Sequence, residues 1–166
     1  MATIIEDTRQ KPEKHQIKNG YWAEHGTDVI RCALPFGDYC VAPSIAVDTK
    51  QDLLEIAVNM CSSAKEKRRF REECKKAQEA GCRLVFLIED PRFRSVDDLY
   101  DTSVYLPTGQ TIPGEQLSMA MKMMAARYGC RFEFCTPEDA GRRVEELLED
   151  ANVEQRMDEN TSQNVG

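Results

Sequence analysis

The sequence predicts an α/β domain built on a mixed β-sheet with helices on both faces. Residues 82–88 are almost continuously apolar, which is typical of a central strand covered by helices on both sides. After Lys50 the apolar residues change from alternation to a helical spacing, which predicts a helix packed on that sheet. The 166 residues, 41% of them hydrophobic, suffice for one domain with its own core. We expect that domain at residues 1–150 and a polar, disordered tail at residues 151–166.

The N-terminal segments predict two strands joined by a polar connection. Residues 2–7 form a short apolar run that ends in two carboxylates, and residues 27–34 predict the second strand. Between them, residues 8–19 predict a loop or a short helix. This segment is either a solvated connection or a phosphate-contacting one.

The second half of the chain predicts alternating helices and strands. Its further elements are helices over 53–60, 62–80 and 115–128, a strand over 131–135, and a final helix that begins near 136–139. Gly81 suits the C-terminal end of the second helix. Residues 91–113 are rich in turn formers, so they predict a long loop that could form part of a substrate wall. The methionines of the helix over 115–128 predict core packing or an oligomer contact.

A hairpin predicted at residues 39–49 would place two carboxylates side by side. Its turn would bring Asp38 close to Asp48 although the sequence separates them. Like charges in a partly buried site repel, so a proton or a cation neutralises such a pair. Oxygen ligands without a nearby His or Cys favour Mg²⁺ or Mn²⁺ over zinc. Strand alternation puts Lys50 on the face of Asp48 and Thr49 on the other, and the Lys50 ammonium could orient and activate a water.

Three short motifs resemble the nuclease domain of the XPF family of structure-specific endonucleases. They are Asp7-Thr8-Arg9, Gly37-Asp38-Tyr39 and Asp48-Thr49-Lys50, which are similar to the family's D-x-R-E, G-D-Y and E-R-K. The resemblance covers residues 3–90, extends more loosely to 148, and implies the restriction-endonuclease-like fold. Gln10, Asp48 and Thr49 replace the family's glutamate, glutamate and arginine. Asp52 lies closer to the lysine than the family's aspartate does.

The resemblance and the carboxylate pair together imply roles for six charged residues. Asp38 and Asp48 would hold Mg²⁺, with Mn²⁺ as a substitute and with help from the backbone carbonyl of Thr49. Asp7 would contribute directly or through water, and Lys50 would position and activate the attacking water. Arg9 and Arg69 would bind phosphate. The implied activity is metal-dependent endonucleolytic cleavage of flap, fork or branched DNA in repair, recombination or replication.

Two alternatives remain open from the sequence. The chain could be a catalytically inactive nuclease-like module that binds DNA or pairs with an active partner, which the departures at Gln10 and Thr49 favour. It could also be a junction-resolving or restriction-type nuclease of the same superfamily. The sequence does not distinguish DNA from RNA as the substrate.

Two other charged stretches allow a structural or a functional interpretation. The basic run at residues 65–71 is either a solvated helix face or a phosphate-binding edge. Glu89 and Asp90 follow the central strand, where they either face water or add a third acidic cluster to the site.

Composition bears on partners and location. The net charge of −7 is unusual for a nucleic-acid binder, but nine acidic and three basic residues follow residue 135, which leaves the first 135 residues near −1. Seven cysteines without zinc-finger spacing, no apolar leader and no apolar run long enough to span a bilayer predict a cytoplasmic protein without membrane contact. The resemblance implies a stand-alone nuclease domain that ends before the helix-hairpin-helix module of many relatives. We therefore expect a homodimer, or pairing with another DNA-processing protein.

Overall fold

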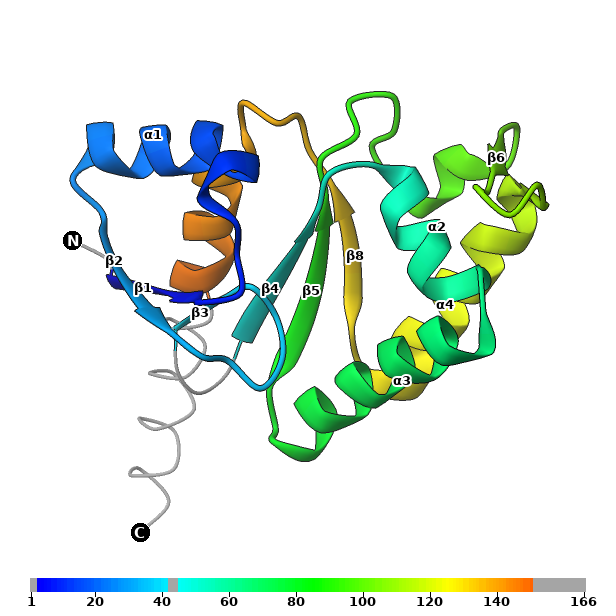
Figure 1. Cartoon of the computed structure of the whole chain (residues 1–166), viewed down its shortest axis with the longest axis horizontal. Coiled ribbons are helices and arrows are strands. Elements are labelled where there is room, and N and C mark those ends of the chain that lie inside the picture. Colours follow the sequence, from blue (N-terminus) through cyan, green and yellow to red (C-terminus); the bar gives the residue numbers. More distant parts are fainter. Residues whose placement is uncertain (1–2, 42–44, 151–166) are drawn as a thin grey trace, which may run out of the picture.

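The computed structural model describes residues 3–41 and 45–150, and its centre is a six-stranded sheet (Figure 1). Its strands lie in the order β2-β1-β3-β4-β5-β8. Their bounds are Thr3–Asp7 (β1), Asp28–Cys32 (β2), Tyr39–Val41 (β3), Ile45–Lys50 (β4), Arg83–Ile88 (β5) and Arg131–Phe134 (β8). β3 is antiparallel to β1 and β4, whereas the other neighbouring pairs are parallel. The mixed sheet and its hairpin are thus confirmed, while the predicted turn at 43–44 and the predicted tail at 151–166 lie outside the described residues.

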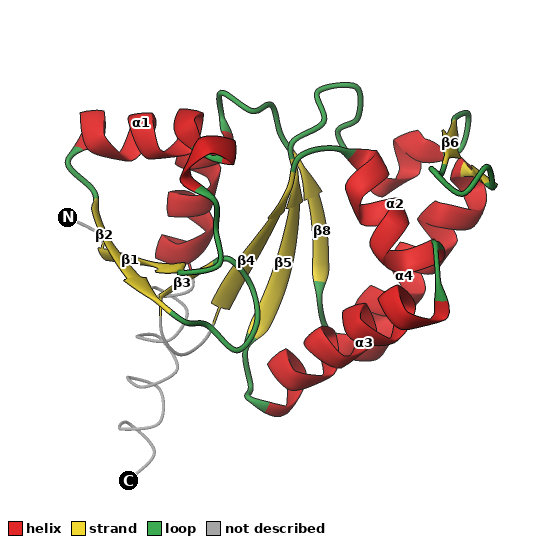
Figure 2. Ribbon diagram, viewed as in Figure 1, coloured by secondary structure: helices red, strands yellow, loops and turns green. Residues whose placement is uncertain are grey.

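Helices cover both faces of this sheet, as predicted (Figure 2). α2 (Leu53–Cys61), α3 (Ala64–Glu79) and α4 (Gly114–Tyr128) lie on one face, and α1 (Gln16–His25) and a helix over 140–150 lie on the other. Each layer has its own core. Phe86 of β5 packs toward α3, where it meets Phe70, whereas Val85 and Leu87 pack with Trp22 of α1. β5 is buried at every residue except Arg83, so it is covered on both faces as its apolar sequence predicted, and it lies one place in from the edge strand β8.

Side chains at the start of α2 and α3 fix where these helices begin. The Asp52 carboxylate accepts the Glu55 N–H at 2.8 Å, and Ser63 accepts the Glu66 N–H at 3.2 Å. Asp90, at the end of β5, accepts the Leu53 N–H at 3.1 Å. These caps start α2 directly after β4 and so set the position of the helix pair beside the end of that strand.

The N-terminal connection contains a helix that extends further than the sequence pattern predicted. Residues 8–19 were expected to form a loop or a short helix, but α1 runs to His25 after a 3₁₀ turn at Pro12–Lys14. Its buried side chains are Lys18 and Trp22, too few to give an apolar period. Trp22 Nε1 donates to the Gly141 carbonyl at 3.1 Å, so this helix is fixed by a contact with a distant segment.

The segment 91–113 has more structure than a loop. It contains a 3₁₀ turn at Val96–Leu99 and a small hairpin of β6 (Ser103–Tyr105) and β7 (Thr111–Pro113). Leu99, Val104 and Ile112 are buried beside α2 and α4. This packing explains why the segment is ordered.

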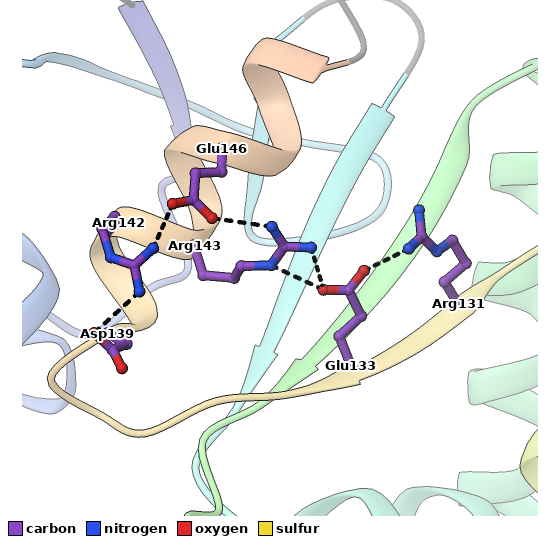
Figure 3. A network of polar contacts seen from close by, with 6 residues as sticks. All are labelled: Arg131, Glu133, Asp139, Arg142, Arg143 and Glu146. Carbon is purple, nitrogen blue, oxygen red and sulfur yellow. Dashed lines mark hydrogen bonds and ion pairs between the residues drawn. The ribbon is translucent and has the colours of Figure 1, made fainter. Parts of the chain in front are cut away.

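Ion pairs tie the helix over 140–150 to the edge strand β8 (Figure 3). Arg143 lies between Glu133 of β8, at 2.7 Å, and Glu146 of its own helix, at 3.0 Å. The network also includes Arg131, Asp139 and Arg142. Within the described ranges no helix combines the length and apolarity that crossing a membrane requires.

Candidate active site

All six predicted site residues line one cavity of about 360 Å³. They come from the end of β1 (Asp7 and Arg9), the residue before β3 (Asp38), the end of β4 (Asp48 and Lys50) and α3 (Arg69). The remaining lining residues include Gly37, Asn59, Glu66, Glu72, Glu73 and Lys76. None of the lining residues comes from 91–113, so the cavity itself gives no support to a substrate wall from that segment.

The strand register places Asp38 opposite Asp48. β3 pairs Tyr39 with Val47, and the Asp38 N–H donates to the Val47 carbonyl at 2.8 Å. Asp48 is buried. Burial, and next the nearby Asp48 charge, hold the pKa of Asp38 well above its usual range. The two carboxylates thus repel one another, as the sequence predicted.

Gly37 allows the chain to approach β4 closely before Asp38. Its φ of +69° lies in the left-handed region, and an added Cβ would lie 3.0 Å from the Ala46 Cβ. A side chain at this position would push the chain away from β4 and so move Asp38 relative to Asp48.

Lys50 neutralises part of this acidic pair. Its Nζ lies 2.6 Å from Asp48 Oδ1, which confirms that both side chains share a face of β4. Burial lowers the pKa of Lys50, but the Asp48 and Asp38 carboxylates outweigh burial and raise it above its usual value. Lys50 is therefore a fixed cation that can donate hydrogen bonds but not accept a proton.

Asp7 holds Arg9 at the edge of the cavity. Asp7 Oδ1 accepts the Arg9 N–H at 2.9 Å and Oδ2 accepts Arg9 Nε at 2.8 Å. Burial raises the pKa of Asp7, but the hydrogen bonds from Arg9 outweigh it and lower the pKa. Arg9 also donates to the Leu34 carbonyl at 2.7 Å, while its side chain stays 69% exposed. In this arrangement Asp7 orients an accessible guanidinium, and its role toward a metal stays a prediction.

Arg69 lies at the exposed edge of the same cavity. Its side chain is 69% exposed and pairs with Glu66 at 3.1 Å, one turn earlier on α3. An exposed ion pair of this kind contributes little stability and is easily exchanged for another anion. Arg69 can therefore turn to a phosphate without loss to the fold.

Thr49 takes part in the site although strand alternation predicted that it points away. Its backbone N–H and its hydroxyl both donate to Asp38 Oδ2. Alternation predicts which face of β4 each of its side chains occupies. It does not predict that the Asp38 side chain, which precedes β3, reaches Thr49.

Glu73 lines the cavity although the sequence did not predict it there. Its Oε1 accepts the Gly37 N–H at 3.0 Å, which links α3 to the chain before Asp38. Burial, and next the Asp48 charge, raise the pKa of Glu73. The sequence did contain a signal, because Glu73 lies three residues after Phe70 and four before Ala77, beside the buried face of α3.

The oxygen donors in the cavity suit Mg²⁺. Asp48 Oδ1 is buried, and apart from its ion pair with Lys50 it has no hydrogen-bond partner among the described residues. Over residues 3–41 and 45–150, no three His, Cys, Asp or Glu side chains lie close enough to form a complete metal site. Magnesium is commonly held by one or two carboxylates and completes its shell with waters and substrate phosphates. Asp38 and Asp48 therefore fit a two-carboxylate site that a substrate would complete.

The acidic pair after β5 lies outside the cavity. Glu89 forms a buried ion pair with Lys18 of α1, and Asp90 caps α2 and binds Arg92 at 2.6 Å. Neither residue lines the cavity, so the interpretation as a third acidic cluster of the site finds no support. Their function is to join helices to the end of β5.

Two solved structures of XPF from Aeropyrum pernix are similar to this chain. The first has a TM-score of 0.61 at 20% identity, and the match covers 97% of this chain and 69% of the XPF chain. The second, XPF in complex with DNA, has a TM-score of 0.59 at 22% identity, and the match covers 93% of this chain and 65% of the XPF chain. A search of curated proteins gave no match.

The likeness to these structures concerns the fold, and it confirms the restriction-endonuclease-like architecture. This chain spans about two thirds of the length of each of the two. A model of the ERCC4 domain matches residues 7–142, which include all six predicted site residues. Because this match covers most of the sequence, the chain belongs to the ERCC4 domain family.

Proposed function

We propose that this chain is a divalent-metal-dependent DNA endonuclease that cuts flap, fork or branched DNA in repair, recombination or replication. The observation that carries the proposal is the convergence of Asp38, Asp48, Lys50 and Arg9 on one cavity from three separate segments. Membership in the ERCC4 domain family and the fold shared with XPF support it.

Each residue would contribute through its observed contacts. Asp38 and Asp48 would hold Mg²⁺ or Mn²⁺, which supplies positive charge to the scissile phosphate and acidifies water. Lys50, fixed beside Asp48, would donate hydrogen bonds to the attacking water and orient it. Arg9, held by Asp7 and exposed, would bind a phosphate oxygen, and Arg69 would bind a neighbouring phosphate.

Assembly as a homodimer, or pairing with another DNA-processing protein, belongs to the proposal. Met119 and Met123 are exposed by 52% and 69% on the outer face of α4, beside Ala120. Exposed methionines on one helix face are typical of contact surfaces. Size-exclusion chromatography with light scattering would test it, and a strict monomer at high concentration would contradict self-pairing.

A catalytically inactive module is the second candidate. The observation in its favour is that the charged groups already satisfy one another, because Arg9 binds Asp7 and Lys50 binds Asp48. Such pairs could make the site a structural unit that binds DNA without cutting it. The carboxylate pair Asp38 and Asp48 argues against this interpretation, because Lys50 supplies only one positive charge for two neighbouring acids.

Cleavage of labelled DNA separates these candidates. Flap, fork, four-way junction and linear duplex DNA, with matched RNA, would be incubated in Mg²⁺, Mn²⁺ or EDTA. We expect cutting of a branched DNA that EDTA and Asp38→Asn abolish, while Asp101→Asn, an exposed site outside the cavity, leaves the rate unchanged. Preferential cutting of junctions or of duplex would identify a junction-resolving or restriction-type enzyme. A folded protein that cuts none of them would establish the inactive module.

A further inference from the structure

Two further hollows adjoin the cavity on the other side of α3. One, of about 410 Å³, is lined by Lys67, Arg68, Arg71, Lys75 and Tyr128, among others. The second, of about 470 Å³, shares Lys67, Arg71 and Tyr128 with the first and adds Arg127 and apolar residues of α2 and α4. Glu72 lines both the first hollow and the candidate active site. The three hollows therefore lie side by side along α3.

The cations of these hollows are largely without protein partners. Lys67, Arg68 and Arg71 are exposed and have no ion-pair partner among the residues that the structure describes. Lys75 has only an exposed contact with Glu79, at 3.7 Å. Grouped like charges repel, and a chain of net charge −7 has ample acid to pair them. Their grouping thus calls for an anionic ligand from outside the chain.

We propose that the basic hollow of about 410 Å³ binds the phosphate backbone of a nucleic-acid strand that continues from the candidate active site. The inference rests on the proposed function for the identity of the strand. Lys67, Arg71 and Tyr128 line this hollow and also border the second, largely apolar one.

The dimensions and composition suit a nucleic-acid backbone. From Lys67 to Lys75 the helix rises about 12 Å, at about 1.5 Å per residue. Along the axis of a duplex, successive phosphates of one strand are about 3.4 Å apart, so this length covers roughly three such steps. Tyr128, with the Arg127 guanidinium 5.4 Å from its ring centre, adds a flat surface for a sugar or an unpaired base. Arg69 and Lys76 line the active-site side of the same helix, so one strand can contact both sides of α3.

Binding without cutting tests the inference. Asp38→Asn protein in EDTA would be titrated with fluorescent single-stranded, duplex and forked DNA by anisotropy, at 50 to 200 mM KCl. We expect Lys67→Ala/Arg71→Ala to weaken binding about tenfold and to reduce the salt slope by about two, because each lost phosphate contact removes close to one released counterion. The matched control is Arg94→Ala/Lys122→Ala, which removes the same charge from exposed positions that line none of the three hollows.

A loss of affinity and of salt dependence that is confined to Lys67→Ala/Arg71→Ala supports the proposed binding surface. The form of DNA that shows the loss identifies the bound strand as single or paired. Equal effects of both double variants, or no effect of either, would overturn the proposal. Because no cutting is measured, a protein that binds through this surface but cuts no substrate would refute the proposed function alone. Circular dichroism and urea unfolding of both variants would show that the fold is intact.

Discussion

Thr49 donates two hydrogen bonds to the carboxylate of Asp38, from its backbone N–H at 2.6 Å and from its hydroxyl at 3.0 Å, both to Oδ2. The bonds join β4 to the chain just before β3. Both favour the charged form of Asp38, against the burial and the Asp48 charge that raise its pKa. Thr49 thus holds one carboxylate of the candidate metal pair in position.

Thr49→Val should lower both stability and activity. The change keeps the side-chain shape and the backbone donor but removes the hydroxyl, so we expect a loss of about 1 kcal/mol in the free energy of unfolding. Cleavage should slow severalfold because Asp38 is held less firmly. Urea unfolding and initial cleavage rates would measure both effects. Thr108→Val, at an exposed position, is the control, and an unchanged Thr49→Val protein would refute the role.

Substitutions of Glu73 should separate its hydrogen bond from its charge. Glu73→Ala leaves the Gly37 N–H without its acceptor and should lower metal-free stability by about 1 to 2 kcal/mol. Glu73→Gln keeps an acceptor oxygen and removes a charge that burial and Asp48 disfavour, so it should be as stable as the parent or more so. Urea unfolding in EDTA tests this order, with the exposed Glu79→Gln as control. Equal losses from both substitutions would contradict it.

The sequence predicted the central sheet and the site better than it predicted the covering layer. β5 and α3 were found because their apolar spacing is set by direct burial against the sheet, as at Phe70, Cys74 and Ala77. The motif residues converge because they flank strands whose register follows from the same pattern. Helix α1 has no comparable spacing of apolar residues. It is held in place by the hydrogen bond from Trp22 to the Gly141 carbonyl, a contact that the local sequence does not predict.

The contacts missed at the site have a similar cause. Glu73 lies 36 residues after Gly37, and only the packing of α3 brings its carboxylate to the Gly37 N–H. The sequence predicts a role for the Thr49 backbone carbonyl, but the two hydrogen bonds that Thr49 donates to Asp38 depend on how far the Asp38 side chain reaches. The motifs identify the repelling carboxylates, but not the donors that hold them in place.

His15 should make the protein less stable in mild acid. It is buried, with no hydrogen-bond partner for Nδ1 among the described residues, and burial, then Lys18 and Lys14, lower its pKa from 6.5 to about 4. Between these values the folded state binds fewer protons than the unfolded state. The contribution of neutral, buried His15 to the free energy of unfolding is therefore complete above pH 6.5, and it is lost as the pH falls toward 4.

His15→Gln should reduce this pH dependence by on the order of 1 kcal/mol between pH 7 and 5, after allowance for partial solvation. Urea unfolding at several pH values would measure it. His25→Gln is the matched control, since His25 is the other histidine and is exposed. Parallel pH profiles for parent and His15→Gln would contradict the assignment.

Divalent metal should stabilise the protein through the carboxylate pair. A ligand at about ten times its Kd adds about 1.4 kcal/mol to the free energy of unfolding. Because the pKa of Asp38 is raised, protons compete with the metal and the gain should grow as the pH rises. Thermal unfolding in Mg²⁺ or Mn²⁺ against EDTA would show a shift for the parent and Asp101→Asn. A shift of the same size in Asp38→Asn would place the metal elsewhere.

Stability should fall when one partner of the Lys18–Glu89 ion pair is removed, but much less when apolar residues replace both partners. Their side chains are only 3% and 10% exposed, and they join α1 to the end of β5. Lys18→Met leaves the Glu89 carboxylate buried without a counter-charge, which should cost about 3 to 5 kcal/mol. Adding Glu89→Leu removes that stranded charge, so the double variant should regain most of the loss. A double-mutant cycle by urea unfolding at pH 7 would measure the coupling. If Lys18→Met alone were as stable as the parent, α1 would be held by the Trp22 contact and this pair would be incidental to it.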